Sequence, residues 1–330
     1  MIARLVLVAT ILVAALAGNV AQAQLKDAGA AETLSAIVRV RAKILSDART
    51  LATLGPLREG SGVLVRDGYV ATIGYLVLEA ESVEVTGADG RTVPAKVVGY
   101  DHASGFGLLR LAAPIGARPL AFGDSTSVAE NDPLVVAGYG GPAAVSFVRV
   151  VSRRPFSGSW EYLLDSAIWT YPAVPNWSGA ALLGPRGELL GIGSLIVADA
   201  AGIGVPAPGN LFVPIDLLVP ILDELIAEGR ARGPARPWLG MNTEELRGRL
   251  VVTRVSPESP AERAGVRAGD VVLGVGPAKV GSLAEFYRRV WALGAAGVEV
   301  PLRVLQSGEE RELRVRSIDR LAHLRRPPGD

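Results

Sequence analysis

The stretch LVVTRVSPESPAERAGVRAGDVVLGV, residues 250–275, holds two short apolar strands separated by a turn that contains proline and glycine. A helix near Ser282–Leu293 follows, and the strand patterns Val298–Val304 and Arg311–Val315 come after it. Short strands that flank a single helix are typical of a small α+β module. We therefore predict that residues 238–317 fold as such a module.

The residues before this module form a larger unit. From Gly60 to about Ile215, short runs of Val, Leu and Ile alternate with turn residues at a spacing of about 8–12 positions, which predicts an all-β barrel or sandwich. Residues 216–229 switch to helical spacing, and Gly229 is a typical helix stop. The larger unit is therefore predicted to end in a helix.

The remaining segments complete the predicted organisation. Residues 230–237, RARGPARP, are typical of a linker between a domain at residues 24–229 and the module at residues 238–317. The chain ends in RRPPGD, and we expect residues 318–330 to be a frayed tail.

Residues 1–23 carry Arg4, a short apolar run and the sequence AQA, which together are typical of a cleaved export signal. The alternative is a retained anchor, but the apolar run is short for the roughly 20 residues that a membrane span needs. We predict cleavage after Ala23 and a periplasmic or secreted protein with no stable membrane anchor.

Composition narrows the chemistry. The chain has 330 residues, 49% hydrophobic and 20% charged, which is typical of a folded protein. A net charge of +1 argues against a nucleic-acid partner, which favours a basic excess. The chain has no cysteine, only two histidines and no metal-ligand spacing, so we expect no metal and no cofactor.

Residues 250–275, with the WLGM sequence that precedes them, resemble the PDZ domain of HtrA-like proteases. The resemblance implies a nest for a terminal carboxylate made by the backbone N–H groups of Leu239, Gly240 and Met241. The strand that follows would pair with an extended peptide, above an apolar pocket floored by Leu239 and Met241. Arg236 would add a positive charge near the carboxylate, or else it is a solvated linker charge. The expected partners are peptides or proteins with apolar C-termini.

Stretches of the larger unit resemble a chymotrypsin-like serine protease of the HtrA type: GSGV at 60–63, DGYV at 67–70, PAKVVGYD at 94–101, FGDS at 122–125 and FVPI at 212–215. The resemblance implies a mainly β fold, a chymotrypsin-like double β-barrel followed by an α+β PDZ domain. The active site of such a fold lies in the cleft between the two lobes.

The positions that carry catalysis in this family are occupied differently here. The motifs place Tyr75 at the position of the catalytic histidine and Gly105 at that of the aspartate, whereas Ser178 keeps the nucleophile position. Asn176 replaces a glycine whose N–H helps to form the oxyanion hole, and Trp177 follows it. Because a serine hydroxyl is a weak nucleophile without a base, the resemblance predicts an inactive protease homologue.

No other residue is a good candidate for the missing base. His102 lies three residues before Gly105 and is predicted to be a surface-turn histidine, and His323 falls in the predicted tail. A tyrosine at position 75 has an ordinary pKa near 10 and would stay protonated at neutral pH. Ser178 is then interpreted as a residue left in a tight turn.

Two functions remain open. The first is an exported, catalytically inactive HtrA-like protein that binds C-termini as an adaptor, a chaperone-like holder or a regulator of active protease relatives in envelope protein quality control. The second is an active serine-type endopeptidase with a rearranged site that uses Ser178. Hydrolysis that depends on Ser178 would distinguish them.

Overall fold

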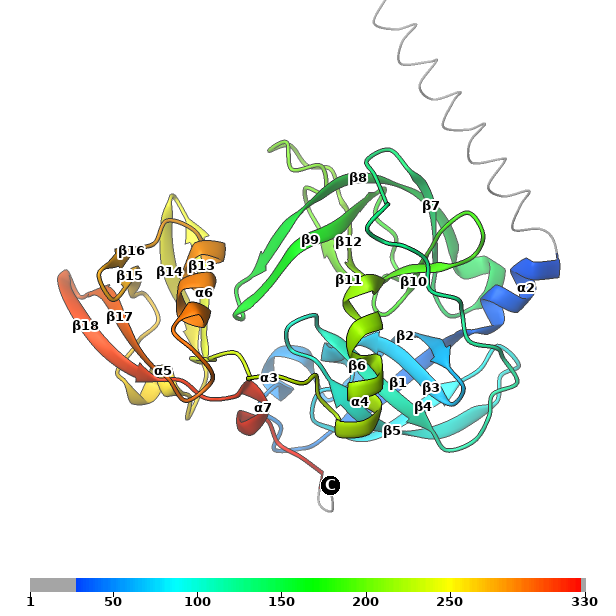
Figure 1. Ribbon diagram of the computed structural model, residues 1–330, viewed down its shortest axis with the longest axis horizontal. Coiled ribbons are helices and arrows are strands. Elements are labelled where there is room, and N and C mark those ends of the chain that lie inside the picture. The colour runs from blue at the N-terminus through cyan, green and yellow to red at the C-terminus, as the bar shows by residue number, and fades with distance from the viewer. Residues whose placement is uncertain (1–27, 328–330) are drawn as a thin grey trace, which may run out of the picture.

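The structure, a computed structural model, describes residues 28–327, and the predicted export signal lies outside the described residues. The chain forms two closed six-stranded β-barrels and a separate six-stranded sheet module (Figure 1). This confirms the predicted mainly β fold of a double barrel followed by an α+β domain. No helix within residues 28–327 has the length and apolar character needed to cross a bilayer.

The first barrel contains the elements α2 (Ala28–Ser35), β1 (Ile37–Ile44), α3 (Leu51–Leu54), β2 (Leu57–Arg66), β3 (Tyr69–Ile73), the 3₁₀ turn η1 (Gly74–Leu76), β4 (Ala80–Thr86), β5 (Thr92–Tyr100) and β6 (Phe106–Leu111). Its strands close in the order β1-β2-β3-β6-β5-β4. The alternating residues of β1, such as Val38 and Val40, point into the buried core, so the barrel begins before the predicted strand region at Gly60.

The second barrel contains β7 (Pro133–Ala137), the 3₁₀ turn η2 (Gly141–Ala144), β8 (Val145–Gly158), β9 (Tyr162–Tyr171), β10 (Ala181–Leu183), β11 (Leu189–Val197) and β12 (Gly209–Pro214). Its strands close in the order β10-β11-β12-β9-β8-β7. The β8–β9 hairpin is long, and its closed end extends from the barrel toward the smaller domain (Figure 1).

A glycine closes the contact between the two barrels. The N–H of Ser61 in β2 donates to the Ser178 carbonyl at 2.8 Å, and the N–H of Tyr139 donates to Ser61 Oγ at 2.9 Å. Gly179 has φ +74°, and a Cβ there would lie 1.9 Å from the Ser61 carbonyl oxygen. Only glycine fits this position, which sets the path of the Ser178 loop.

The predicted helix over residues 216–229 is only partly helical. It consists of two 3₁₀ turns, η3 (Ile215–Leu217) and η4 (Val219–Ile221), followed by α4 (Leu222–Glu228). Pro220 lies in the second 3₁₀ turn, where its missing N–H cannot continue a regular α-helical ladder. Gly229 ends α4 in the left-handed conformation, as predicted.

The smaller domain contains β13 (Met241–Leu246), β14 (Arg249–Val255), α5 (Pro260–Arg263), β15 (Val271–Val275), β16 (Ala278–Lys279), α6 (Leu283–Ala292), β17 (Glu299–Gln306) and β18 (Glu309–Arg316). The predicted helix and two closing strands are confirmed to within a few residues. The sheet order β13-β14-β15-β17-β18 leaves β13 at an edge. One face of α6, including Phe286 and Val290, is buried in the domain core.

The segment after residue 317 is ordered, so the prediction of a frayed tail is wrong for the described residues 318–327. Ile318 pairs with Trp238, and a short helix, α7 (Arg320–His323), follows. The N–H of Arg325 then donates to the buried Glu79 carboxylate at 2.8 Å. The segment therefore joins the smaller domain to the first barrel.

Candidate functional site

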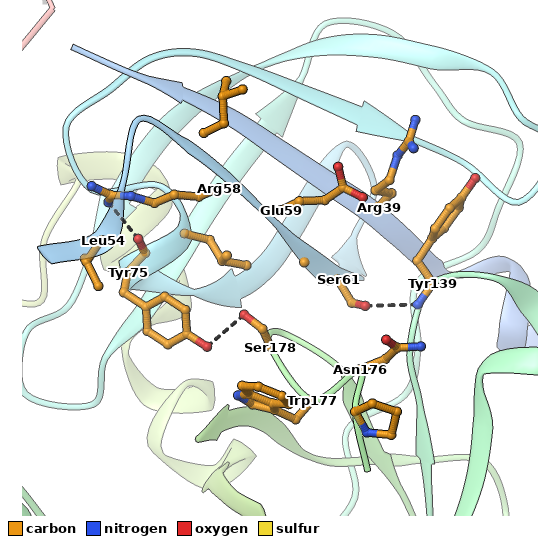
Figure 2. Close-up of a pocket in the computed structure, with 14 residues that line it drawn as sticks. Arg39, Leu54, Arg58, Glu59, Ser61, Tyr75, Tyr139, Asn176, Trp177 and Ser178 are labelled. Atoms are coloured by element: carbon orange, nitrogen blue, oxygen red, sulfur yellow. Dashed lines mark hydrogen bonds between the residues drawn. The ribbon is translucent and has the colours of Figure 1, made fainter. Parts of the chain in front are cut away.

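Ser178 opens onto a cleft of about 530 Å³ between the two barrels (Figure 2). The first barrel contributes Arg58 and Tyr75 to its lining, and the second contributes Tyr139 and residues 175–178. The cleft thus brings together Tyr75, Asn176 and Ser178, three of the predicted site residues. Gly105 does not line it.

The hydroxyl of Tyr75 stands next to the hydroxyl of Ser178. The two oxygens are 2.7 Å apart, and Tyr75 Oη also lies 2.8 Å from the Ser194 carbonyl oxygen. A carbonyl only accepts, so Tyr75 donates its single proton to Ser194. Ser178 is then the donor in its bond to Tyr75, and its proton faces a phenol oxygen.

Burial keeps this phenol neutral. Loss of solvation raises the pKa of Tyr75 to about 12, and its hydrogen bond to Ser178 only partly opposes this. At pH 7 a group with that pKa is about 10⁻⁵ ionised. Tyr75 therefore cannot take a proton from Ser178 at neutral pH.

A buried arginine fixes the backbone that carries Tyr75. Arg58 is 5% exposed and donates to the carbonyls of Tyr75 and Leu78 at 2.8 and 3.0 Å (Figure 2). It also donates to Thr50 Oγ1 at 2.7 Å, and that hydroxyl donates to the Glu79 carboxylate at 2.6 Å. Because removal of one partner would leave a buried charge unpaired, the network holds Tyr75 firmly in the cleft.

Gly105, at the predicted acid position, lies beneath another tyrosine. It has φ +85°, and a Cβ there would lie 3.1 Å from Tyr162 Oη. That hydroxyl donates to the Ser104 carbonyl at 2.5 Å, and the N–H of Gly74 donates to the Gly105 carbonyl at 2.7 Å. The backbone at Gly105 is thus suited to glycine and leaves little room for a carboxylate side chain.

Both histidines have partners away from Ser178. His102 is half-buried rather than a free surface-turn residue: its ring lies 3.2 Å from Tyr100 Oη and 2.9 Å from Arg320 Nη1. Burial, followed by the positive charge of Arg320, lowers its pKa well below the usual value. The His323 ring packs on Trp238, with centroids 4.7 Å apart. Within residues 28–327, no group of three or more His, Asp and Glu side chains is placed to hold a metal ion.

In the smaller domain, the three backbone N–H groups that were predicted to hold a terminal carboxylate converge on a side-chain carboxylate. Glu161, in the turn between β8 and β9, accepts from the N–H groups of Leu239 at 2.8 Å, Gly240 at 2.6 Å and Met241 at 3.1 Å. Gly240 has φ +86°, and a Cβ there would lie 2.2 Å from Ser259 Cβ. The turn of three donors therefore depends on a glycine at this position.

The contact continues along the groove. The N–H of Thr243 in the edge strand β13 donates to the Ser159 carbonyl at 3.0 Å, and the Tyr287 hydroxyl of α6 donates to the Gly158 carbonyl at 2.8 Å. Leu163, which belongs to β9, is 5% exposed and buried in the core cluster of the smaller domain with Leu239 and Met241.

Arg236, at the end of the linker, lies beside an aromatic ring of the smaller domain. Its exposed side chain places Cζ 4.3 Å from the centroid of the Trp291 ring in α6. This is cation–π geometry.

Glu161 and Leu163 were not predicted from the sequence as residues of this groove. Glu161 is 78 residues from Leu239, and no local motif links the two. The only sequence signal is indirect: Glu161 is a charged residue in a turn between strands rich in aromatic and aliphatic residues.

The fold and these two sites define a class of protein. Residues 60–192 match the family described as "Trypsin-like peptidase domain", and residues 237–316 match "PDZ domain". The chain thus has the domain order of an HtrA-like protease with one PDZ domain.

Sequence relatives agree with that class. The chain is 30% identical over 279 residues to a "Probable periplasmic serine protease do/HhoA-like" of Haemophilus influenzae, and 30% identical over 275 residues to the "Periplasmic pH-dependent serine endoprotease DegQ" of Escherichia coli. Each match covers 78% of this chain but only 57% and 58% of the relative. The chain therefore spans a little over half the length of these relatives.

Solved structures show the same fold. "HtrA-type protease AlgW with decapeptide" superposes with a TM-score of 0.53 at 21% identity, over 90% of this chain and 98% of that one. "HtrA-type protease AlgW with tripeptide" gives the same TM-score and identity, over 90% and 96%.

Proposed function

We propose that this chain is an exported, periplasmic HtrA-like protein that binds the C-termini of peptides or proteins and does not hydrolyse them. The observation that carries the proposal is the bond between Ser178 and Tyr75, because it places a neutral phenol where the reaction needs a base. Loss of the base from a serine protease triad lowers kcat by about 10⁶-fold. Serine attack at neutral pH therefore has no effective proton acceptor.

The binding half of the proposal is supported by the PDZ loop. The N–H groups of Leu239, Gly240 and Met241 converge on one carboxylate, which is the geometry that a free C-terminus needs. Leu239 and Met241 are almost fully buried beside the groove, which favours an apolar terminal residue. A protein of this kind acts as an adaptor, a chaperone-like holder or a regulator of active relatives in the cell envelope.

The alternative is a serine endopeptidase that uses Ser178. In its favour, the relatives are named as serine proteases and the cleft at Ser178 is open. In addition, the N–H groups of Asn176 and Ser178 have no acceptor within the described protein and would be free to bind an oxyanion.

Two assays on the chain from Gln24 onward separate these functions. The first compares casein hydrolysis, and labelling by a fluorophosphonate, between the unmodified chain and Ser178→Ala. We expect no difference, and hydrolysis that disappears in Ser178→Ala would establish the endopeptidase instead. The second titrates fluorescein-labelled octapeptides ending in Leu or Val. We expect binding of the free carboxylates, and equal binding of the C-terminal amides would argue against carboxylate capture.

A further inference from the structure

We propose that the turn between β8 and β9, residues 158–163, is an internal ligand of the PDZ groove, so that an external C-terminus binds only by displacing it. The inference rests on the proposed function, because it identifies what competes for the proposed binding site. We call residues 158–163 the internal ligand.

The carboxylate of Glu161 uses all three donors of the loop. One of its oxygens accepts from Leu239, and the other accepts from Gly240 and Met241. The side chain is buried, with 3% of the residue exposed. An external carboxylate needs the same N–H groups, and two anions cannot share them in a buried site. Binding of the two is therefore mutually exclusive.

The groove is also filled beyond the carboxylate. An added peptide strand would pair with the free edge of β13, but the N–H of Thr243 on that edge already donates to the Ser159 carbonyl. The side chain of Leu163 lies in the core cluster beside Leu239 and Met241. The internal ligand thus supplies a carboxylate, a strand contact and an apolar side chain, which are the three elements of a peptide C-terminus.

The backbone of the turn is held in an uncommon conformation. Glu161 has φ +61°, a left-handed conformation that residues with a side chain rarely adopt. Such a conformation persists when surrounding contacts over-determine it. Here those contacts are the three N–H groups of the PDZ loop and the bond from Tyr287 to the Gly158 carbonyl. The turn is therefore shaped by the groove that it occupies.

Displacement does not require the two domains to separate. Arg49 of the first barrel pairs with Glu258 of the PDZ domain, and the chain after residue 317 joins the domain to Glu79. These contacts lie outside the internal ligand. An external peptide therefore competes with one hairpin end, and its apparent Kd equals the intrinsic Kd divided by the fraction of chains in which the groove is open.

The test uses the cysteine-free chain and the free-carboxylate octapeptides. Glu161→Ala removes the whole carboxylate group from the nest, and we expect it to tighten peptide binding tenfold or more. Asp165→Asn is the matched control, because Asp165 lies on the same hairpin and pairs only at the exposed rim, with Arg288. We expect its Kd to be unchanged.

A second variant locks the groove. The side chains of Ser159 and Asn242 meet, with Oγ and Nδ2 3.3 Å apart, and the N–H of the adjacent Thr243 donates to the Ser159 carbonyl. Ser159→Cys with Asn242→Cys therefore places two thiols on facing segments of a chain that has no other cysteine. We expect this variant to oxidise readily without peptide, to lose peptide binding when oxidised and to regain it on reduction.

The outcomes separate the inference from the proposed function. Equal Kd values for the unmodified chain and Glu161→Ala, or undiminished binding by the oxidised double variant, overturn the inference and leave the proposed function standing. Absence of peptide binding in every reduced variant overturns the proposed function instead. In that case the disulfide yield of the double cysteine variant without peptide still tests the inference. Quantitative oxidation supports a closed groove, and absence of oxidation contradicts it.

Discussion

The PDZ loop and the cleft at Ser178 differ in the chemical groups that they present. The PDZ loop holds a carboxylate with the backbone N–H groups of three successive residues, positioned by Gly240. At the cleft, hydrolysis needs a side-chain base beside the Ser178 hydroxyl. That position holds Tyr75.

The comparison shows that binding and catalysis depend on different parts of the sequence. A nest of N–H groups persists as long as the backbone keeps its turn, so most side-chain replacements leave it intact. Proton transfer instead requires one side-chain type with a suitable pKa. Under the proposed function, this chain keeps a backbone site for a peptide carboxylate and lacks the side-chain base, and each prediction below tests one side of that contrast.

The largest expected effect is on the PDZ loop itself. Gly240→Ala introduces a Cβ 2.2 Å from Ser259 Cβ at φ +86°. We expect a loss of about 3 kcal/mol or more in the stability of the PDZ domain, from backbone strain and overpacking, with loss of peptide binding. Thermal and urea unfolding followed by tryptophan fluorescence, together with peptide titration, measure this.

Gly248→Ala is the matched control for Gly240→Ala. Gly248 also has a positive φ, of +73°, but a Cβ there meets nothing within 4 Å. It should cost only about 1 kcal/mol and leave peptide binding intact. Similar losses of binding in the two variants would show that the loop does not depend on close packing at Gly240.

The next effect concerns attempts to restore the protease. In the double variant Tyr75→His with Gly105→Asp, the new aspartate lies at φ +85° with its Cβ 3.1 Å from Tyr162 Oη. We expect a destabilisation of about 2 kcal/mol and no gain in casein hydrolysis, because the aspartate cannot settle where it would orient the histidine. If the double variant hydrolyses casein and a further Ser178→Ala change abolishes that activity, the backbone of the cleft is competent and only the two side chains are missing.

The features that could be predicted directly from the residues are those whose signal lies within a short stretch of the chain. The strand runs between Gly60 and Ile215, the helix capped by Ser282 and the nest at Leu239–Met241 each carry their signal within a few residues. Tyr75 and Ser178 were paired only through family resemblance, because they are 103 residues apart. The structure adds that their hydroxyls meet.

That Glu161 binds the nest could not be predicted from the sequence. Glu161 reaches Leu239 through the packing of a barrel hairpin on a separate domain, and no periodicity encodes that contact. The order of residues 318–327 was missed for the same reason: Arg325 is held by Glu79, a partner 246 residues away. Contacts between domains depend on surface shape rather than on local pattern.

A smaller effect follows from the ionisation of Glu161. Burial raises its pKa to about 7, against the bonds from the nest and the charge of Arg320. The closed groove therefore holds a proton more tightly than the open one. Its stability is full below about pH 4.5 and falls as pH rises toward 7. Peptide affinity should thus increase about tenfold between pH 5.5 and 7.5.

Glu161→Gln isolates this effect from the other groups that face the site. Arg320, Arg236, Tyr287 and His102 are the other charged or titratable groups near the site; burial and the charge of Arg320 lower the pKa of His102, and burial raises that of Tyr287. The variant keeps all four groups, so the difference between its pH profile and that of the unmodified chain belongs to Glu161. Parallel profiles would remove Glu161 from the pH response.

The smallest expected effect is the loss of stability when Tyr75 in the cleft loses its hydroxyl. Tyr75→Phe removes the donor to the Ser194 carbonyl and the partner of Ser178, so we expect a loss of about 1 kcal/mol in the free energy of unfolding. Tyr69→Phe is the control, because the Tyr69 hydroxyl makes no hydrogen bond within residues 28–327, and it should change stability little. Since Ser178 gains no base when Tyr75 loses its hydroxyl, neither variant should hydrolyse casein. Hydrolysis in Tyr75→Phe would mean that the Tyr75 hydroxyl inhibits an otherwise competent Ser178. The cleft would then differ from an active site by an inhibitory contact rather than by the lack of a base.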